Sequence, residues 1–384
     1  LDAKTDTKTD TKTDTKTDSN PSVVNESKIA SSTIVVRAVN SKTLLQDEGL
    51  LRAIFTLLVE AHYQTRPADL RQLLDVPYLH LWIAEEINTD GSANKVVGVL
   101  LAYEEGGFDA AADDMLNGIV SGQRRPQGNL LSQSIANQSA DTQWCRVKSL
   151  RVARIAFAQS YRRQGIASRL LNSLEQFARA EACDYWGSSF GFDPDLLAFW
   201  QSHQALPVHL GLHRDKSSGM RNLMVVKALS KSLDTMSHSL YQQFIIDLPF
   251  WSKRYLEDMP TKAIKCLSND GFKFSYMGEG KGEGESESED EYHSQLVPSE
   301  QQSKAYDHFR IQRFINAELP YDKIYPSLCR ILLAANKAPT DYPVTHSSLL
   351  LAPNWSALAN KFQLNGRRDV IASIKAELIQ LTAD

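Results

Sequence analysis

The sequence contains few cysteines, no long apolar run and no motif that alone identifies a nucleotide site. Four of its 384 residues are cysteine, and they lack Cys-x-x-Cys spacing, which argues against a disulfide framework or a zinc site. No apolar run approaches the roughly 18 residues of a membrane helix. The N-terminal segment lacks the charged head and apolar stretch of a secretory signal, and no GxxxxGKS or GxxxxGKT loop occurs. We expect a soluble cytoplasmic protein with no bound metal and no membrane partner.

The sequence does have a sizeable apolar content and an uneven distribution of charge. Hydrophobic residues make up 42% of the chain, which excludes a wholly disordered protein. The formal net charge is −4, but residues 278–291 carry seven acids and one Lys, whereas residues 141–170 carry seven cations and one acid. The second segment suits an anionic ligand such as a phosphate group or a nucleic acid. The alternative is an ordinary solvated basic face.

Composition and periodicity divide the chain into three parts. Residues 1–18 repeat Lys-Thr-Asp-Thr and have no apolar side chain after Ala3, which predicts a disordered linker over residues 1–32. Strand-like and helix-like segments alternate over residues 33–230, which predicts an α/β domain on a mixed sheet. Residues 231–384 turn helical and predict a separate C-terminal domain, with a disordered acidic loop at 278–291.

The pattern within the α/β region is specific enough to predict individual elements. The strand-like segments are 33–39, 78–85, 95–103, 147–158, 185–192, 208–212 and 223–229. The helical segments are 44–61, a short one from Pro67, 108–120, 129–137, 165–180 and 194–204. The helix at 165–180 is amphipathic, because Ile166, Leu170, Leu174, Phe177 and Ala178 share one face.

The sharpest local signal is the turn Arg-Arg-Gln-Gly-Ile-Ala-Ser at residues 162–168, between a predicted strand and a predicted helix. Small residues at such a turn let successive backbone N–H groups approach an anion, and the helix N-terminus adds partial positive charge. Arg162 and Arg163 add formal charge. The spacing resembles R/Q-x-x-G-x-G/A, the pyrophosphate-binding turn of the GCN5-related N-acetyltransferases, with Ala167 in the last small position. The alternative is a structural helix start.

Five further blocks narrow the resemblance. They occur in the order AHYQTRPADL at 61–70, RRPQGNL at 124–130, RIAF at 154–157, SFGF at 189–192 and HRDKSSG at 213–219. Together they resemble the acetyltransferase half of the bacterial tRNA(Met) cytidine acetyltransferases, from about residue 44 to 230. Residues 328–333 and 364–368 resemble the tail domain of the same family more loosely.

The resemblance implies a mixed acetyltransferase sheet with flanking helices and a mainly helical tail. The activity it implies is N4-acetylation of the wobble cytidine of elongator tRNA(Met), with acetyl-CoA as donor and no DNA partner. In the family a helicase-like module precedes this half, and ATP or GTP would act only through that module. The module is missing from these residues. We expect either that the chain is a fragment of a longer product, or that the module is lost or separately encoded.

The resemblance also implies which residues hold acetyl-CoA. Ile155, Ala156 and Phe157 would contact it along a strand edge. Asp195 stands where the family has Glu and is a further candidate, whereas Ser202 stands where an Arg contacts the cofactor. The residues that would hold the diphosphate are Arg162, Arg163, Gln164, Gly165, Ile166, Ala167 and Ser168.

His62 is our candidate for the general base, because it lies in the first block and has a near-neutral intrinsic pKa. The alternative is a helix-end histidine bonded to backbone. The RNA-binding candidates are Arg124, Arg125, His213, Arg214, Arg367 and Arg368. For the loop that carries Arg124 and Arg125 the alternative is a solvated loop. For the tail, which carries Arg367 and Arg368, the alternative is a domain that only packs against the catalytic domain and does not bind RNA.

Two rival functions stay open at this point. One is a GCN5-type enzyme that acetylates a protein amine, and the other is an inactive RNA-binding remnant. We expect the aromatic side chains Phe199 and Trp200 to belong to the core rather than to a base-stacking platform.

Overall fold

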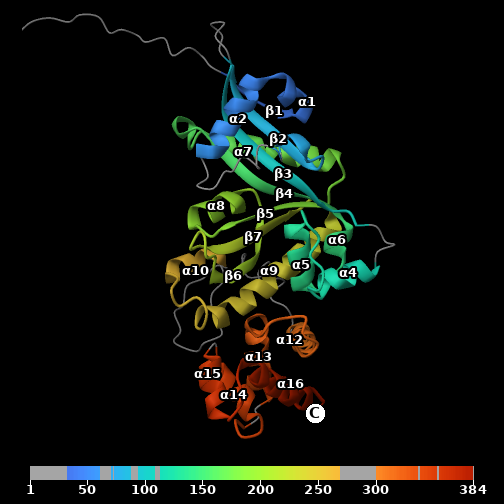
Figure 1. Ribbon diagram of the computed structural model, residues 1–384, viewed down its shortest axis with the longest axis vertical. Helices are drawn as coiled ribbons and strands as arrows, with labels where there is room; N and C mark the ends of the chain where they lie inside the picture. Colours follow the sequence, from blue (N-terminus) through green and yellow to red (C-terminus); the bar gives the residue numbers. More distant parts are fainter. Residues whose placement is uncertain are drawn as a thin grey trace, which may run out of the picture.

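The computed structural model describes residues 33–60, 71, 73–87, 94–108, 113–268, 300–335, 338–352 and 354–383. The segments predicted to be disordered, 1–32 and 278–291, lie outside these residues, and so does His62. The described chain forms a twisted sheet with helices on both faces, followed by a helical tail at the other end of the molecule (Figure 1).

A seven-stranded mixed sheet forms the centre of the α/β region, in the order β1-β2-β3-β4-β5-β7-β6. All neighbouring pairs are antiparallel except β4 and β5, which are parallel. The predicted mixed sheet is confirmed, with a strand at each predicted position. The strands are β1 (Thr33–Val39), β2 (Leu79–Ile87), β3 (Lys95–Gly106), β4 (Lys148–Phe157), β5 (Tyr185–Gly191), β6 (Leu206–Arg214) and β7 (Arg221–Ala228).

Among the described residues the helices of this region differ from the prediction in three places, and the start of the short helix predicted from Pro67 lies outside those residues. The helix predicted at 108–120 begins at Asp113. The single helix predicted at 44–61 is two helices, because the Asp47 carboxylate accepts a hydrogen bond from the Leu50 amide at 2.8 Å and so starts a new helix. The short helix α6 was not predicted, because a segment of four residues is too short to show the spacing of apolar residues that marks a helix. The helices are α1 (Ser41–Gln46), α2 (Glu48–Glu60), α4 (Asp113–Val120), α5 (Leu130–Ser139), α6 (Gln143–Arg146), α7 (Ile166–Ala180) and α8 (Pro194–Ser202).

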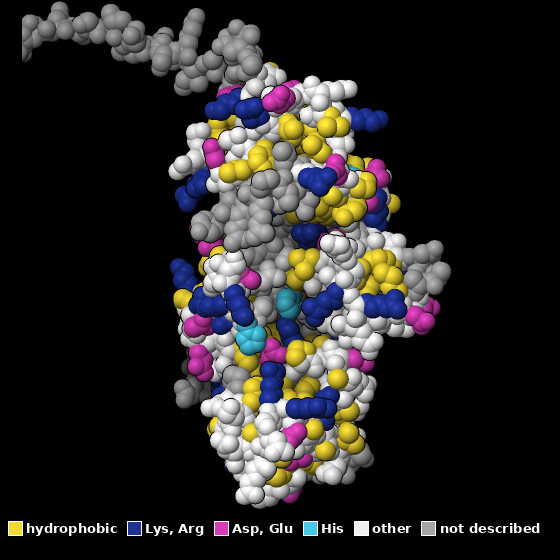
Figure 2. Space-filling view, in the orientation of Figure 1, with side chains coloured by type: hydrophobic (Ala, Val, Ile, Leu, Met, Phe, Trp, Pro, Cys, Tyr) yellow, Lys and Arg dark blue, Asp and Glu magenta, His cyan; other side chains and the backbone are white. Residues whose placement is uncertain are grey.

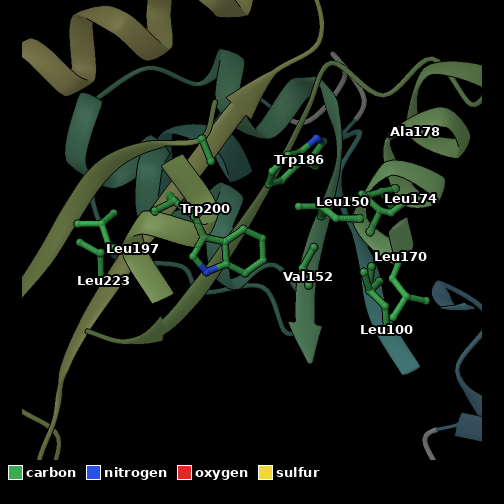
Figure 3. Close-up of a cluster of buried hydrophobic side chains, with 14 of the residues drawn as sticks. Leu100, Leu150, Val152, Leu170, Leu174, Ala178, Trp186, Leu197, Trp200 and Leu223 are labelled. Atoms are coloured by element: carbon green, nitrogen blue, oxygen red, sulfur yellow. The ribbon is translucent and has the colours of Figure 1, made fainter. Parts of the chain in front are cut away.

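The main core lies between the sheet and α7. Figure 3 shows Leu170, Leu174 and Ala178 of α7 facing Leu100 and Leu150 of the sheet. These five side chains are fully buried, as the predicted amphipathic face requires. Because side chains alternate along a strand, the other residues of the same strands face a second core on the side of α2.

Trp200 anchors an aromatic cluster in this core, which confirms its predicted core position. Its ring lies 6.0 Å from that of Trp186, 5.8 Å from that of Phe190 and 5.2 Å from that of Phe199. Trp200 is 5% exposed, so it offers no surface on which a base could stack.

The C-terminal region is helical, as predicted. The helices α9 (Lys231–Ser252) and α10 (Thr261–Leu267) pack on the sheet, and Phe244, Leu248 and Leu267 join its core. The domain boundary at residue 230 stays a prediction. A separate core begins at Ile311 and is formed by the remaining helices, α12 (Glu300–Ile315), α13 (Tyr321–Ala335), α14 (Pro343–Leu351), α15 (Trp355–Lys361) and α16 (Arg367–Ala383).

Arg313 of α12 joins the tail to the α/β region. Its guanidinium donates to the carbonyl oxygens of Val120 and Asn137, each at 2.6 Å, and to Glu318 at 3.0 Å. On the other side of the junction the Trp251 indole donates to the Asp322 carbonyl at 3.0 Å. The tail is therefore fixed by buried polar contacts as well as by apolar packing.

No helix in the described part of the chain is long and apolar enough to cross a membrane.

Candidate functional site

The parallel strands β4 and β5 pair only over their first halves. Residues 149–152 pair with residues 185–188, but β4 continues to Phe157 and β5 to Gly191. The cause is a bulge in β4: Leu101 pairs with Arg154 and Ala102 with Val152, which leaves Ala153 without a partner in β3. A bulge bends its strand. The two strands therefore diverge beyond Val152.

The predicted residues Ile155, Ala156 and Phe157 lie on the diverging half of β4. They pair with β3 on one side, and β5 does not pair with them on the other. Val152 and Ser188 form the last pair between the two strands, and the Ser188 hydroxyl donates a hydrogen bond to the Val152 carbonyl at 2.9 Å. No strand of the described chain pairs with this edge, so its backbone groups can bind an extended ligand with amide groups of its own, in the way that an added strand binds a sheet.

The predicted turn at 162–168 follows this edge directly. A single 3-10 turn, η2 (Gln159–Tyr161), leads from β4 into it. Gly165 is the N-cap of α7 with a φ of 75°, and apart from its chain neighbours no atom of the described chain lies within 4 Å of the position that a Cβ would take. The backbone conformation favours glycine, and the space beside it is open within the described chain.

The first turn of α7 has free hydrogen-bond donors. Gly165 has no side chain to cap the helix, and the first hydrogen bond runs from the Arg169 amide to the Gly165 carbonyl at 3.0 Å. The amides of Ile166, Ala167 and Ser168 therefore have no backbone acceptor within the described chain. Together with the helix dipole these donors fit a bound anion.

Contacts on both sides hold the turn in place. The Tyr161 hydroxyl donates to Glu86 of β2 at 2.6 Å, and this hydrogen bond raises the pKa of Tyr161, so the hydroxyl stays protonated. The Gln164 side-chain amide donates to the Ser160 carbonyl at 2.9 Å. A Cβ on Gly98 would lie 2.9 Å from the Ile166 side chain, so glycine in β3 lets α7 begin close to the sheet.

The basic run at 141–170 does not form one surface. Arg151 is paired with the buried Glu105, Arg146 with Asp113, and Lys148 lies 3.6 Å from Glu104. Arg162 and Arg163, in contrast, are exposed beside the turn. Acidic residues elsewhere in the fold thus compensate the charges of Arg146, Lys148 and Arg151. The part of the basic segment that remains a candidate for anion binding is the turn at 162–168.

Glu105 is a residue that the sequence did not single out. Its carboxylate accepts from the amides of Leu131 at 2.7 Å and Ser132 at 3.1 Å, at the start of α5, and it pairs with Arg151. Burial raises the pKa of Glu105, and the Arg151 guanidinium opposes the rise. Since α5 starts directly after the block at 124–130, Glu105 fixes the end of that loop to the sheet.

The RNA-binding candidates lie on separate surfaces. Arg124 and Arg125 are exposed, and Arg124 lines a cleft of about 450 Å³ shared with Glu318 of the tail. His213 and Arg214 are also exposed, and each lies near an acid: His213 is 3.4 Å from Asp322, and Arg214 is 2.6 Å from Asp258. Arg367 and Arg368 are exposed at the start of α16, far from α7, as Figure 1 shows.

The predicted cofactor residue Asp195 is exposed in the first turn of α8, where Asp193 caps the helix by accepting the amides of Asp195 and Leu196. Ser202, at the other end of α8, donates its hydroxyl to the Phe199 carbonyl at 2.7 Å. The next residue, His203, reaches the turn: its Nε2 lies 3.1 Å from the Ser168 Oγ. No local signal in the sequence could reveal this contact, because the two residues are 35 positions apart.

The sheet with its splayed parallel pair and open turn has a counterpart among known families. Residues 53–183 match the family model GNAT acetyltransferase 2. Over these residues the chain is similar to the GNAT acetyltransferases. The strand β4, the turn at 162–168 and the whole of α7 lie within the matched range.

The similarity to individual proteins extends beyond the residues that match the family model. The chain is related to the tRNA(Met) cytidine acetyltransferase TmcA of Vibrio cholerae serotype O1, with 31% identity over 332 residues, 86% of this chain and 41% of that protein. TmcA of Pectobacterium atrosepticum is 38% identical over 228 residues, 59% of this chain and 31% of that protein. The chain thus spans less than half of these relatives. A match of 332 residues must reach into the helical tail.

Solved structures of acetyltransferases align with about half of the chain. Arabidopsis thaliana NAA60 in complex with acetyl-CoA aligns with 51% of this chain and 99% of its own, at 14% identity and a TM-score of 0.34. At that level the alignment carries no argument about a substrate.

Proposed function

We propose that this chain is an acyltransferase that moves the acetyl group of acetyl-CoA to the exocyclic N4 amine of the wobble cytidine in tRNA(Met). The observation that carries the proposal is the turn at 162–168, next to the edge of β4 that β5 leaves unpaired; the amides of this turn at the start of α7 have no backbone acceptor within the described chain. The similarity to TmcA supports the RNA substrate. Because tRNA acts in the cytoplasm, the proposal assigns the protein to that compartment.

The donor would be held by two sets of groups. The amides of Ile166, Ala167 and Ser168 would bind the diphosphate, with Arg162 and Arg163 beside it. The free edge of β4 would bind the amides of the pantetheine arm. Acetyl-CoA, when bound, supplies an activated thioester.

In the proposed reaction the cytidine amine attacks the thioester carbonyl, an N–C bond forms, the C–S bond breaks and CoA leaves as the thiol. The amine loses one proton, and the thiolate gains one. The amine is conjugated with the ring and is a weak nucleophile, so positioning and proton removal carry much of the rate. Backbone N–H groups at the opening between β4 and β5 would stabilise the oxyanion.

His62 is the proposed base, and its substitution separates chemistry from binding. We expect His62→Ala to keep the affinity for acetyl-CoA but to lower kcat by about 100-fold or more, because a positioned base contributes at least that much. The affinity is measured by calorimetry and kcat by tRNA acetylation. The control is His238→Ala, which removes an exposed histidine on α9. A near-normal kcat in His62→Ala would remove His62 from the mechanism.

We propose that exposed cationic side chains bind the RNA. They are Arg124 and Arg125 in the loop between α4 and α5, and His213 and Arg214 near the junction of the sheet with the tail. Figure 2 shows Lys, Arg and His side chains gathered where the sheet region meets the tail. We expect the double variant Arg124→Ala, Arg125→Ala to raise KM for tRNA and to lower the salt dependence of binding by about two phosphate contacts. Arg52→Ala, which removes another exposed arginine on α2, is the matched control. An unchanged salt slope would exclude this loop from the RNA surface.

The direct test of the function compares acceptors. With acetyl-CoA as donor, the proposal predicts acetylation of a tRNA(Met) transcript and none of lysine peptides, with ATP or GTP and the helicase-like module of the family supplied separately. Acetylation of lysine peptides instead would support a protein acetyltransferase. Absence of saturable acetyl-CoA binding would support an inactive RNA-binding remnant.

A further inference from the structure

His203 connects the end of α8 to the first turn of α7. Its Nε2 lies 3.1 Å from the Ser168 Oγ, and its ring meets that of Phe199 edge-on at 5.0 Å between centroids. The ring is therefore held on one side by its own helix while its nitrogen faces the turn. Ser202, one residue earlier, donates to backbone and does not reach α7.

The surroundings keep the His203 imidazole neutral. The charged groups that face it in the described part of the chain are Lys227 of β7 and Glu175 of α7, which pair with each other at 2.8 Å. Burial and the Lys227 charge lower the pKa of His203, and Glu175 opposes this only in part. At neutral pH the ring thus carries one N–H, and it can donate to one partner and accept from another.

The direction of the contact with Ser168 determines what the hydroxyl can do. A serine hydroxyl has one proton to donate. When the His203 Nε2–H donates to the Ser168 Oγ, that proton stays available for a ligand at the turn. The Ser168 amide is also one of the free donors of α7, so both polar groups of Ser168 can face the same anion.

This inference rests on the proposed function. We propose that His203 is a positioning residue, which holds the Ser168 Oγ as an acceptor so that the hydroxyl donates to the diphosphate of CoA. Two consequences distinguish this role from simple packing. His203 acts only through Ser168, and the bound diphosphate favours the protonated ring, so that binding takes up protons.

The first consequence is tested by a double-mutant cycle on the affinity for acetyl-CoA, measured by calorimetry. We expect Ser168→Ala to weaken binding about tenfold, since it removes a hydrogen bond to the charged diphosphate. We expect His203→Ala to have about the same effect, because the Ser168 hydroxyl is then no longer held in position. The double variant is expected to be no weaker than either single one. A double variant about 100-fold weaker than the wild type would overturn the proposal, because the two residues would then act independently.

The second consequence is tested with His203→Gln, whose side-chain amide can donate to Ser168 but cannot titrate. We expect its affinity at pH 7.5 to lie within about threefold of the wild type, because the hydrogen bond is retained. Proton uptake on binding, measured by calorimetry in buffers of different ionisation heat, is expected in the wild type and in the His238→Ala control and to be lost in His203→Gln. Wild-type proton uptake in His203→Gln would overturn the proposal. If His203→Ala fails to fold, His203→Phe, which keeps a ring but cannot donate a hydrogen bond, replaces it in the cycle with Ser168→Ala.

The sign of the pH dependence follows from the same argument. The pKa of His203 is lowered in the free protein and raised by the diphosphate, so affinity increases as the pH falls between these two values. Failure of the wild type to bind acetyl-CoA would contradict the proposed function itself. Saturable binding by the wild type, lost in Gly165→Glu but unaffected in His203→Ala, would contradict only the role of His203.

Discussion

Gly165→Glu is expected to abolish acetyl-CoA binding, with a loss of affinity of about 100-fold or more, while the fold is retained. Two effects act together. A non-glycine residue at a φ of 75° is strained by about 1 kcal/mol, and the new carboxylate stands in open space beside the free amides of α7. There it would take the place of the diphosphate and repel it.

The measurement is a calorimetric titration of both variants with acetyl-CoA, and thermal melts check the fold. The matched control is Gly219→Glu, in the turn between β6 and β7. Gly219 also has a positive φ, 68°, and open space at the Cβ position. The Gly219→Glu variant introduces the same backbone strain and the same charge, but outside the turn at 162–168. We therefore expect its affinity for acetyl-CoA to equal that of the wild type. Retained binding in Gly165→Glu would contradict the assignment of the turn.

Asp247→Ala is expected to destabilise the helical tail by about 3–5 kcal/mol, the cost of leaving buried charges without a partner. Asp247 of α9 is 1% exposed and pairs with Arg310 of α12 and with Arg330 of α13, the latter at 2.7 Å. Arg330 also binds Asp307 at 2.6 Å. Removing the one carboxylate that both arginines share leaves Arg310 with no carboxylate partner within the described chain.

Chemical denaturation followed by circular dichroism measures this loss. Asp234→Ala removes an exposed carboxylate from the same helix, where it lies 3.5 Å from His238, and we expect a change below about 1 kcal/mol. Equal stabilities of the two variants would mean that the buried network does not hold α9, α12 and α13 together.

The features that depend on neighbouring residues could be predicted from the sequence. The face of α7 follows from the spacing of Ile166, Leu170 and Leu174, and all three are buried. The turn at 162–168 also has a local cause, because a strand, a glycine and a helix follow one another within a few residues. Asp47, which divides α1 from α2, is a recognisable helix cap that the longer apolar period conceals.

The features that depend on register and distant contacts could not be predicted. The opening between β4 and β5 results from the bulge at Ala153, which exists only in the pairing with β3. The basic segment 141–170 suits an anionic ligand by its composition, but Arg151 pairs with Glu105, 46 positions away, so the two charges compensate each other. The contact of His203 with Ser168 is of the same kind.

The central claim is that the amides of the turn and the free edge of β4 bind acetyl-CoA. Hydrogen–deuterium exchange with and without acetyl-CoA tests it most directly, because it reports on the backbone amides themselves. The account predicts that the ligand slows exchange at residues 163–168 and 153–157 and leaves the tail unchanged. Unchanged exchange at both segments, with protection elsewhere in the chain, would contradict it.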